Sequence, residues 1–475
     1  MKHITIFLYF LLFAVYVNAQ KQKKNYLEAF KLIEVWLETQ KDFENIPGMI
    51  AMVVEDQDVL WTGAFGKSNL EQNIAMDVNT ICSICSITKS FTAVAIMKLI
   101  DEEKLNLEDK VEDLLPFFKV KQKFPSKKEI TVRSLLSHAS GLPGNTNHSY
   151  FTEPDFIFPT QKEFRFVFKE LETISEVETD VNYSNIGYAL LGEIITKVSG
   201  VPYEDYIQRE ILNPLKMTDT SIKTLVSINK HATGYTAINR NRTRASVNLF
   251  DTKSMKPAMG LWSSINDLAK YASWQFRLHE ASKSEILKPT TLKRMHSVQS
   301  KSKNGYMNWG LGFEIIEASN GDTWVSHGGT CPGFVSLLQL NLSSKIGLVI
   351  MINGNRSQTF KYLNGIKQIL AKVKPIKKSG NADINLKDFV GYYNMNPWNS
   401  EVYISPWIDG LVVLQLPENS PKYGMRFYKH IKNDTFQFVK QNGELGDEFI
   451  FQRDGNGKIY RYKDGGNYKY KIKKH

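Results

Sequence analysis

The chain has 475 residues, of which 42% are hydrophobic and 12% aromatic, and a formal net charge of +11 at pH 7. This length predicts one large and one small domain, and the composition excludes a disordered or fibrous protein. The basic residues are scattered rather than grouped with aromatic residues on one element, which argues against nucleic acid as a partner. The excess charge favours solubility and weak attraction to anionic cell-envelope polymers.

The N-terminus has the pattern of a secretory signal peptide. Lys2 and His3 precede an apolar run from Ile4 to Val17, and small residues at the −3 and −1 positions predict cleavage after Ala19. An uncleaved membrane anchor is the alternative, but the run is shorter than the ~18 residues that a span needs, and no later segment reaches that length. We therefore expect an exported protein, periplasmic or extracellular, without a membrane span.

Hydrophobic periodicity predicts a succession of helices and antiparallel strands over the next 350 residues or so. Helices are expected over residues 26–45, 87–104, 186–199, 202–212 and 357–371, and strands over 49–62, 323–327 and 334–353. This order predicts an α+β fold, in which an antiparallel sheet is flanked by helices and interrupted by an all-helical insert.

After residue 371 the pattern changes to short alternating segments separated by Asp-Gly, Asn-Gly and Gly-Gly turns, which predict a small all-β domain. The expected organisation is a signal peptide at 1–19, a large domain at 20–371, a linker at 372–383 and the β domain at 384–475. Some of the aromatic residues of the last domain are interpreted as core rather than as a binding platform: Trp398, Trp407, Phe427, Phe436 and Phe438.

Ser86-Ile-Thr-Lys89 stands at the start of the predicted helix 87–104. Residues at i and i+3 share a helical face, so a neutral Lys89 would be placed to activate the Ser86 hydroxyl. The spacing alone also fits an ordinary helix start, and it recurs at Ser227 and Ser300. Only the copy at Ser86 heads an apolar helix.

Two further patterns carry groups suited to acyl transfer. Tyr183-Ser-Asn185 offers a phenol that can pass on a proton and an amide that can bind a carbonyl, although Tyr-x-Asn also occurs at three other places. His327-Gly-Gly329 follows a predicted strand, and the two glycines would let the backbone approach a ligand closely. A lone histidine is otherwise more often structural than catalytic.

Together, in this order, these three motifs resemble the signature of serine β-lactamases, penicillin-binding DD-peptidases and their esterase relatives. The similarity is greatest to the class C β-lactamase and D-alanyl-D-alanine carboxypeptidase branch, and it covers about residues 30–371. Several further blocks resemble the same branch: residues 130–143, 214–221, 231–235, 260–268 and 309–313. Residues 384–475 resemble the small β-barrel-type domains appended to this family.

The resemblance implies a role for each motif residue. Ser86 would form the acyl-enzyme, Lys89 would accept its proton, and Tyr183 would protonate the leaving group. Asn185, His327, Gly329 and Thr330 would bind the substrate, with the backbone N–H groups of Ser86 and Thr330 as the oxyanion hole. No metal and no organic cofactor is implied.

One departure concerns the third motif, where many members have lysine and this chain has His327. Histidine is near-neutral at pH 7, whereas lysine is a fixed positive charge that attracts a substrate carboxylate. The resemblance is then to the esterases and D-amino-acid peptidases of the family rather than to efficient β-lactamases.

Export makes a disulfide possible among Cys82, Cys85 and Cys331. The resemblance implies a Cys85–Cys331 bond that braces the site, as in some class A carbapenemases. The alternative is that all three are small apolar core residues.

The expected function is an exported serine hydrolase acting on an amide or ester, with a small-molecule or peptide substrate of possible cell-wall origin. The alternatives are a penicillin- or peptidoglycan-binding sensor that deacylates slowly and a non-catalytic scaffold. The oligomeric state does not follow from the residues.

Overall fold

The computed structural model describes residues 26–124, 128–222, 230–318, 321–373 and 384–473. The predicted signal peptide and most of the predicted linker lie outside these residues. The chain divides into two compact units, one formed by Asn45–Phe360 and the other by the residues up to Glu44 together with Lys361–His475. Within the described ranges, no helix has both the length and the apolar character needed to cross a membrane.

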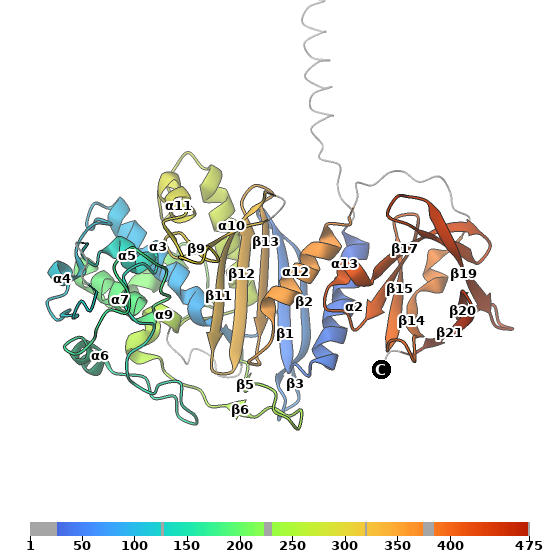
Figure 1. Cartoon of the computed structure of the whole chain (residues 1–475), viewed down its shortest axis with the longest axis horizontal. Coiled ribbons are helices and arrows are strands. Elements are labelled where there is room, and N and C mark those ends of the chain that lie inside the picture. The colour runs from blue at the N-terminus through green and yellow to red at the C-terminus, as the bar shows by residue number, and fades with distance from the viewer. Residues whose placement is uncertain (1–25, 125–127, 223–229, 319–320, 374–383, 474–475) are drawn as a thin grey trace, which may run out of the picture. The chain divides into compact units, whose positions relative to one another are not determined.

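A nine-stranded antiparallel sheet forms the framework of the unit 45–360 (Figure 1). Its strands, in spatial order, are β3 (Ile74–Ala75), β2 (Asp58–Asn69), β1 (Gly48–Glu55), β13 (Ile346–Ile352), β12 (Phe334–Asn341), β11 (Thr323–Cys331), β10 (Glu314–Glu317), β9 (Asn308–Trp309) and β8 (Ser300–Lys301). The first hairpin therefore pairs with the last strand of this unit, with Met49 opposite Ile352.

Between β3 and β8 the chain is mainly helical, as predicted, and it also contains two short strand pairs that the prediction of an all-helical insert did not include. The helices are α3 (Thr88–Asp101), α4 (Val111–Leu114), α5 (Val132–Leu136), α6 (Gln161–Val167), α7 (Asn185–Ser199), α8 (Tyr203–Ile207), α9 (Lys256–Met259), α10 (Ile265–Glu280) and α11 (Pro289–Met295). The strand pairs are β4 (Cys82–Ser83) with β7 (Trp262–Ser263), and β5 (Gly234–Tyr235) with β6 (Ser246–Val247).

Helix α3 is the central helix of this unit. Its side chains are buried at every position except Lys98, Ile100 and Asp101, and α7 and α9 pack against it. Helix α10 packs against β1 and β13. Apolar burial on this scale stabilises the fold, since each fully buried large apolar side chain contributes about 1.5–3 kcal/mol. The predicted α+β architecture is confirmed.

Local signals define where α7 begins and ends. The Ser184 hydroxyl accepts a hydrogen bond from the backbone N–H of Gly187, which caps the first turn. Gly200 ends the helix in the left-handed region at φ 70°, where glycine avoids the steric cost of a Cβ. The helix start therefore places Tyr183 and Asn185 on either side of the capping serine.

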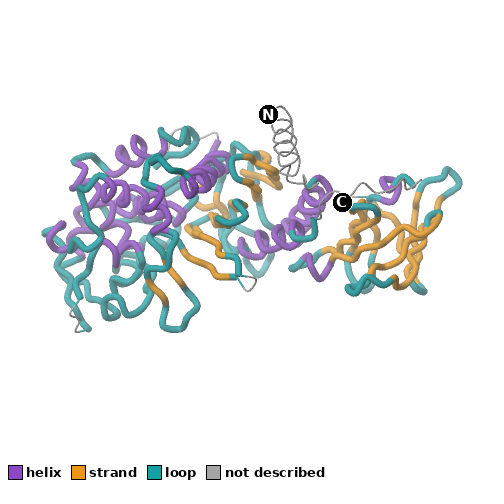
Figure 2. The backbone as a smooth tube through the Cα atoms, turned by 90° about the horizontal axis from the view of Figure 1, so that it is seen from above, coloured by secondary structure: helices purple, strands orange, loops and turns teal. Residues whose placement is uncertain are grey.

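The second unit contains a closed antiparallel barrel, whose strands Figure 2 shows in orange. The strands are β14 (Gly391–Asn394), β15 (Glu401–Trp407), β16 (Gly410–Leu416), β17 (Met425–Lys432), β18 (Thr435–Val439), β19 (Leu445–Arg453), β20 (Ile459–Asp464) and β21 (Asn467–Ile472). Helix α2 (Leu27–Phe43), most of α12 (Thr359–Leu370) and α13 (Pro421–Gly424) belong to the same unit. The predicted small all-β domain is confirmed.

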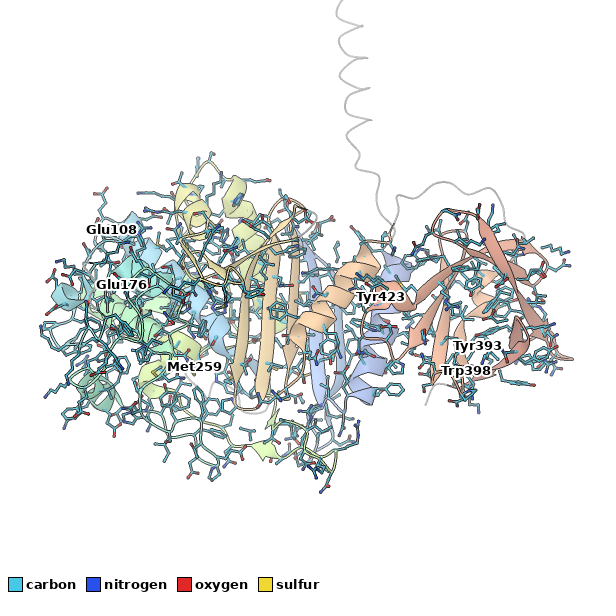
Figure 3. All side chains as sticks on the ribbon, viewed as in Figure 1. Glu108, Glu176, Met259, Tyr393, Trp398 and Tyr423 are labelled. Carbon is cyan, nitrogen blue, oxygen red and sulfur yellow. A yellow bond between two sulfur atoms is a disulfide. The ribbon has the colours of Figure 1, made fainter. Side chains whose placement is uncertain are left out.

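Not all aromatic residues of the barrel unit are core residues. Phe436 is fully buried, Trp407 is buried, and Phe427 and Phe438 are partly exposed. Trp398, labelled in Figure 3, is 79% exposed, so its interpretation as core is wrong. It lies between β14 and β15, outside the alternation that turns every second side chain inward.

Candidate active site

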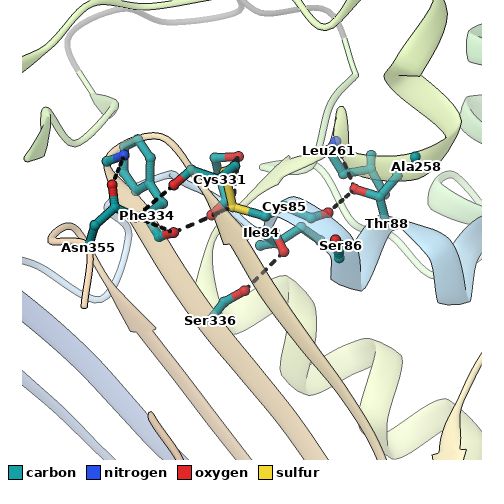
Figure 4. Close-up of a disulfide and its surroundings, with 12 residues drawn as sticks. Ile84, Cys85, Ser86, Thr88, Ala258, Leu261, Cys331, Phe334, Ser336 and Asn355 are labelled. Atoms are coloured by element: carbon teal, nitrogen blue, oxygen red, sulfur yellow. Dashed lines mark hydrogen bonds between the residues drawn. A yellow bond between two sulfur atoms is a disulfide. The ribbon is translucent and has the colours of Figure 1, made fainter. Parts of the chain in front are cut away.

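Ser86 lies in a single 3₁₀ turn, η1 (Cys85–Ile87), directly before α3. Sequence periodicity placed it at the helix start, and the structure inserts this turn before the first α-helical residue. Cys85 has φ 49°, in the left-handed region that non-glycine residues seldom adopt. The Thr88 hydroxyl donates to the Cys85 carbonyl at 2.6 Å and accepts from the Leu261 N–H at 3.1 Å (Figure 4). The turn that presents Ser86 is therefore held by neighbours on both sides.

Lys89 is fully buried beneath Ser86 and has three oxygen neighbours. Its Nζ lies 3.1 Å from Ser86 Oγ, 2.7 Å from Asn185 Oδ1 and 2.9 Å from the Ala258 carbonyl oxygen. No carboxylate among the described residues forms an ion pair with it, and burial lowers the pKa of Lys89 well below its ordinary value. Because a carbonyl and an amide oxygen only accept, Nζ donates to those two, and once deprotonated it would keep a lone pair for the Ser86 proton.

Tyr183 and Asn185 complete the group around Lys89. The Tyr183 ring lies with its centroid 4.7 Å from Lys89 Nζ. Burial raises the pKa of the Tyr183 phenol well above its ordinary value, and a hydrogen bond with Ser86 offsets part of this rise. Two of the three motifs thus meet at Ser86, although about 100 residues separate them in the chain.

His327 brings the third motif to the same place from β11. Its Nδ1–H donates to the Gly328 carbonyl at 2.7 Å, which leaves the lone pair on Nε2. That atom is buried and has no hydrogen-bond partner among the described residues. Burial, with a smaller contribution from Lys89, lowers the pKa of His327 to about 3, so the ring is neutral at pH 7. Its centroid lies 6.4 Å from that of Tyr183.

The two glycines after His327 differ in their surroundings. A Cβ on Gly329 would lie 2.3 Å from the Ile84 carbonyl oxygen and 2.4 Å from Ser336 Oγ, whereas a Cβ on Gly328 would meet nothing closer than 3.8 Å. Both glycines were expected to admit a ligand. At Gly329 the structure shows instead a close approach of β11 to the segment that carries Ser86.

Thr330 lies on the part of β11 that has an open edge. β10 pairs only with Thr323–Ser326, and Thr330 pairs with Val335 of β12 on the other side. Because a Cβ on Gly329 would meet Ile84 and Cys85, β11 approaches the Ser86 turn closely at the residue before Thr330.

The Cys85–Cys331 disulfide joins the end of β11 to the Ser86 turn, and it is the pairing that the resemblance implied (Figure 4). Cys82 is a free, buried thiol, and burial raises its pKa to about 12. The Ser336 hydroxyl adds a hydrogen bond of 2.9 Å to the Ile84 carbonyl. The Ser86 turn is therefore held against the sheet by the disulfide, by the Ser336 hydrogen bond and by its close contact with Gly329.

Removal of this disulfide is expected to destabilise the protein. The bond closes a loop of 246 residues, and the loss of such a constraint on the unfolded chain costs about 2–5 kcal/mol. Urea unfolding of Cys85→Ala/Cys331→Ala measures this loss. Cys82→Ala, which removes a buried thiol without breaking a cross-link, is the matched control. Equal losses in the two proteins would contradict a stabilising role for the bond.

Three residues near the motifs had no role assigned from the sequence. Asn145 Oδ1 accepts from Asn185 Nδ2 at 2.8 Å and so turns Asn185 Oδ1 toward Lys89. Ala258 supplies only its carbonyl, which no side-chain pattern reveals. His138 packs on Tyr183, with ring centroids 4.3 Å apart, and the block 130–143 that contains it was the one available signal.

Comparisons with known proteins find a family model and several similar proteins. A family model described as Beta-lactamase matches residues 36–371. The chain is 28% identical over 373 residues to Beta-lactamase-like protein 4 of Dictyostelium discoideum, covering 73% of this chain and 63% of that protein. It is 29% identical over 318 residues to Protein flp of Staphylococcus aureus (strain N315), covering 66% and 60%. The chain thus spans about three-fifths of the length of these curated relatives.

Among solved structures, the chain is similar to an octameric penicillin-binding protein homologue from Pyrococcus abyssi. The TM-score is 0.64 at 25% sequence identity, and the match covers 93% of this chain and 99% of that chain. The similarity therefore extends over both units of the fold.

Proposed function

This chain belongs to the β-lactamase family, and we propose that it is an exported serine hydrolase that forms an acyl-enzyme on Ser86. Its substrate would be an amide or ester. The observation that carries the proposal is the position of Lys89, which is buried with no ion-pair partner among the described residues and lies 3.1 Å from Ser86 Oγ. A buried neutral amine beside a hydroxyl is the arrangement that turns a serine into a nucleophile.

In the acylation step, Lys89 Nζ takes the Ser86 proton as Oγ bonds to the substrate carbonyl carbon. The negative charge that develops on the carbonyl oxygen is stabilised by the backbone N–H groups of Ser86 and Thr330. As the carbon–nitrogen or carbon–oxygen bond breaks, Tyr183 gives its proton to the leaving group and is reprotonated from Lys89. Water then attacks the ester on Ser86 with the same groups acting in reverse.

The neutral charge of His327 affects which class of substrate the site would bind. Its Nδ1–H is engaged by the Gly328 carbonyl, so the side chain offers the site an acceptor on Nε2 and no positive charge. This arrangement supports an ester or peptide substrate ahead of a β-lactam whose carboxylate requires a cationic partner.

Intact-mass analysis over time tests the proposal. The mature protein is incubated with a fluorescent penicillin, a p-nitrophenyl acyl ester and a D-alanyl peptide, and Ser86→Ala is treated in parallel. We expect a transient adduct with turnover for at least one substrate, and a loss of at least about 10⁴-fold in Ser86→Ala. The matched control is Ser90→Ala on α3, because the Ser90 hydroxyl donates to the Ile87 carbonyl and has no hydrogen bond to the Lys89 side chain among the described residues.

The other outcomes separate the alternatives. An adduct that forms on Ser86 and persists favours the slowly deacylating sensor. The absence of both adduct and turnover with all three substrates contradicts the hydrolase and favours the scaffold.

A further inference from the structure

His138 is a buried imidazole beside the site that the proposed reaction does not use. It follows α5, is 0% exposed, and has φ 56°. Histidine and asparagine occupy this left-handed region more readily than most side chains do. A buried polar ring in such a conformation is retained only where its contacts compensate for the cost.

His138 forms hydrogen bonds with the residues on either side of Tyr183 in the chain. The N–H of Asn182 donates to the His138 carbonyl at 2.8 Å, and the N–H of Ser184 donates to His138 Nδ1 at 3.0 Å. The residues immediately before and after Tyr183 are therefore both bound to the same histidine.

The His138 ring also covers the Tyr183 side chain. The two ring centroids are 4.3 Å apart at 33°. Trp309 stands edge-on to His138 at 4.6 Å, and Tyr188 lies at 5.1 Å. Tyr188 is itself anchored, because its hydroxyl donates to the Leu136 carbonyl at 2.8 Å. Trp309 and Tyr188 thus hold the His138 imidazole in the orientation in which it packs against the Tyr183 ring.

The segment after His138 continues along the second motif. Ser184 Oγ donates to the Pro143 carbonyl at 2.7 Å, and the Asn185 N–H donates to the Gly144 carbonyl at 2.8 Å. Hydrogen bonds from residues 138–144 therefore hold residues 182–185 in place. Within this segment, His138 is the residue whose side chain packs on Tyr183.

The hydrogen bond to Ser184 requires one tautomer of His138. Since Nδ1 accepts, the proton of a neutral ring is on Nε2, which is buried and unpartnered in the part of the chain that the structure describes. A second proton would set an N–H against the Ser184 N–H. Burial, Lys89 and His327 all lower the pKa of His138 well below its ordinary value, so the acceptor form persists.

We propose that His138 is a positioning residue that holds Tyr183 in place for proton transfer to the leaving group, through its Nδ1 bond to Ser184 and its ring contact. The inference rests on the proposed function, in which Tyr183 gives that proton. The inference predicts that loss of His138 lowers kcat most for substrates whose leaving group must be protonated as it departs.

Two substitutions separate the acceptor from the rest of the side chain. In His138→Asn, Oδ1 takes the position of Nδ1 and can accept from Ser184, and asparagine tolerates the positive φ. In His138→Gln, the amide is displaced by one carbon and no acceptor remains at that position. The thermal unfolding temperature of each variant is first compared with that of the wild type, so that a folding defect is recognised.

Hydrolysis of an alkyl ester and of the p-nitrophenyl ester of the same acid is then compared. A p-nitrophenolate leaves without protonation, whereas an alkoxide does not. We expect His138→Gln to lose about 10²-fold in kcat on the alkyl ester with little change in KM, and less than about 5-fold on the p-nitrophenyl ester. His138→Asn is expected to restore most of the alkyl-ester activity.

Combination with Tyr183→Phe gives a second readout. If His138 acts through Tyr183, His138→Gln adds no further loss in the Tyr183→Phe background. Equal losses on both esters, or losses that multiply in the double variant, would overturn the inference while wild-type turnover upholds the proposed function. A wild-type protein without any Ser86-dependent adduct would overturn the proposed function and the inference with it.

Discussion

The Lys89→Met variant is expected to lose acyl-enzyme formation on Ser86, with an acylation rate about 10³–10⁴-fold below that of the wild type. In the structure, Nζ is the basic atom within hydrogen-bond distance of Ser86 Oγ, at 3.1 Å. Asn185 Oδ1 is turned to Lys89 by Asn145 and is no substitute for an amine. Stopped-flow acylation by the p-nitrophenyl ester, followed by intact mass, measures the loss.

The same variant is expected to remain folded. Lys89 is fully buried without an ion pair among the described residues, so its replacement by an apolar side chain of similar length removes a desolvation cost. The opposing cost is the loss of the partner of Asn185 Oδ1 and of the Ala258 carbonyl, about 1–3 kcal/mol for each acceptor left buried. Lys98→Met on the same helix, where Lys98 pairs with Glu102, is the control for any lysine replacement in α3. Acylation of Lys89→Met within tenfold of that control would contradict the assignment of Lys89 as the base.

A Gly329→Ala substitution is expected to lower kcat by about 10²-fold or more, because a displacement of about 1 Å in a catalytic group has effects of that size. The added methyl would lie 2.3 Å from the Ile84 carbonyl oxygen and 2.4 Å from Ser336 Oγ. It would also displace the Ser336 hydroxyl from its 2.9 Å bond to Ile84. Since Ile84 precedes the turn that carries Ser86, the clash moves the nucleophile.

Gly328→Ala is the matched control for Gly329→Ala. The two residues are adjacent on β11, both changes add one methyl group, and the space at Gly328 is open to 3.8 Å. We expect Gly328→Ala to retain activity and unfolding temperature, and Gly329→Ala to lose about 1–3 kcal/mol of stability besides its activity. Similar kinetics in the two variants would contradict a packing role for Gly329.

These effects have a common structural origin in the attachment of the Ser86 turn to β11. The Cys85–Cys331 bond, the Ser336 hydrogen bond and the contact at Gly329 all act on residues 84–86. Tyr183 and Asn185 are held separately by residues 138–145. The nucleophile and the proton donor therefore belong to two segments with different supports, which meet through the hydrogen bond between Lys89 and Asn185.

The sequence by itself determined several of the main elements, though not the 16-residue helix α10, and the identity of the motif residues. Period-2 and period-3.6 patterns over 49–62, 87–104, 186–199 and 334–353 correspond to β1–β2, α3, α7 and β12–β13, because burial of one face imposes these periods locally. The all-β character of the last domain was predictable for the same reason, from alternating segments and Gly-containing turns, whereas its barrel form was only implied by the resemblance. Trp398 shows the limit, since alternation gives no information on a residue between strands.

Only the tertiary structure decided how the motif residues act on one another. The lowered pKa of Lys89 depends on its burial between segments that are distant in the chain, and the Ala258 carbonyl that it contacts is backbone and carries no signature. Glycine is required at position 329 because a Cβ there would clash with the carbonyl oxygen of Ile84, 245 positions away in the chain. The positioning role of His138 depends on its hydrogen bonds with the backbone N–H groups of Asn182 and Ser184. Local patterns record which face of an element is buried. Contacts between distant segments, which set proton positions and pKa values, arise only when the chain is folded.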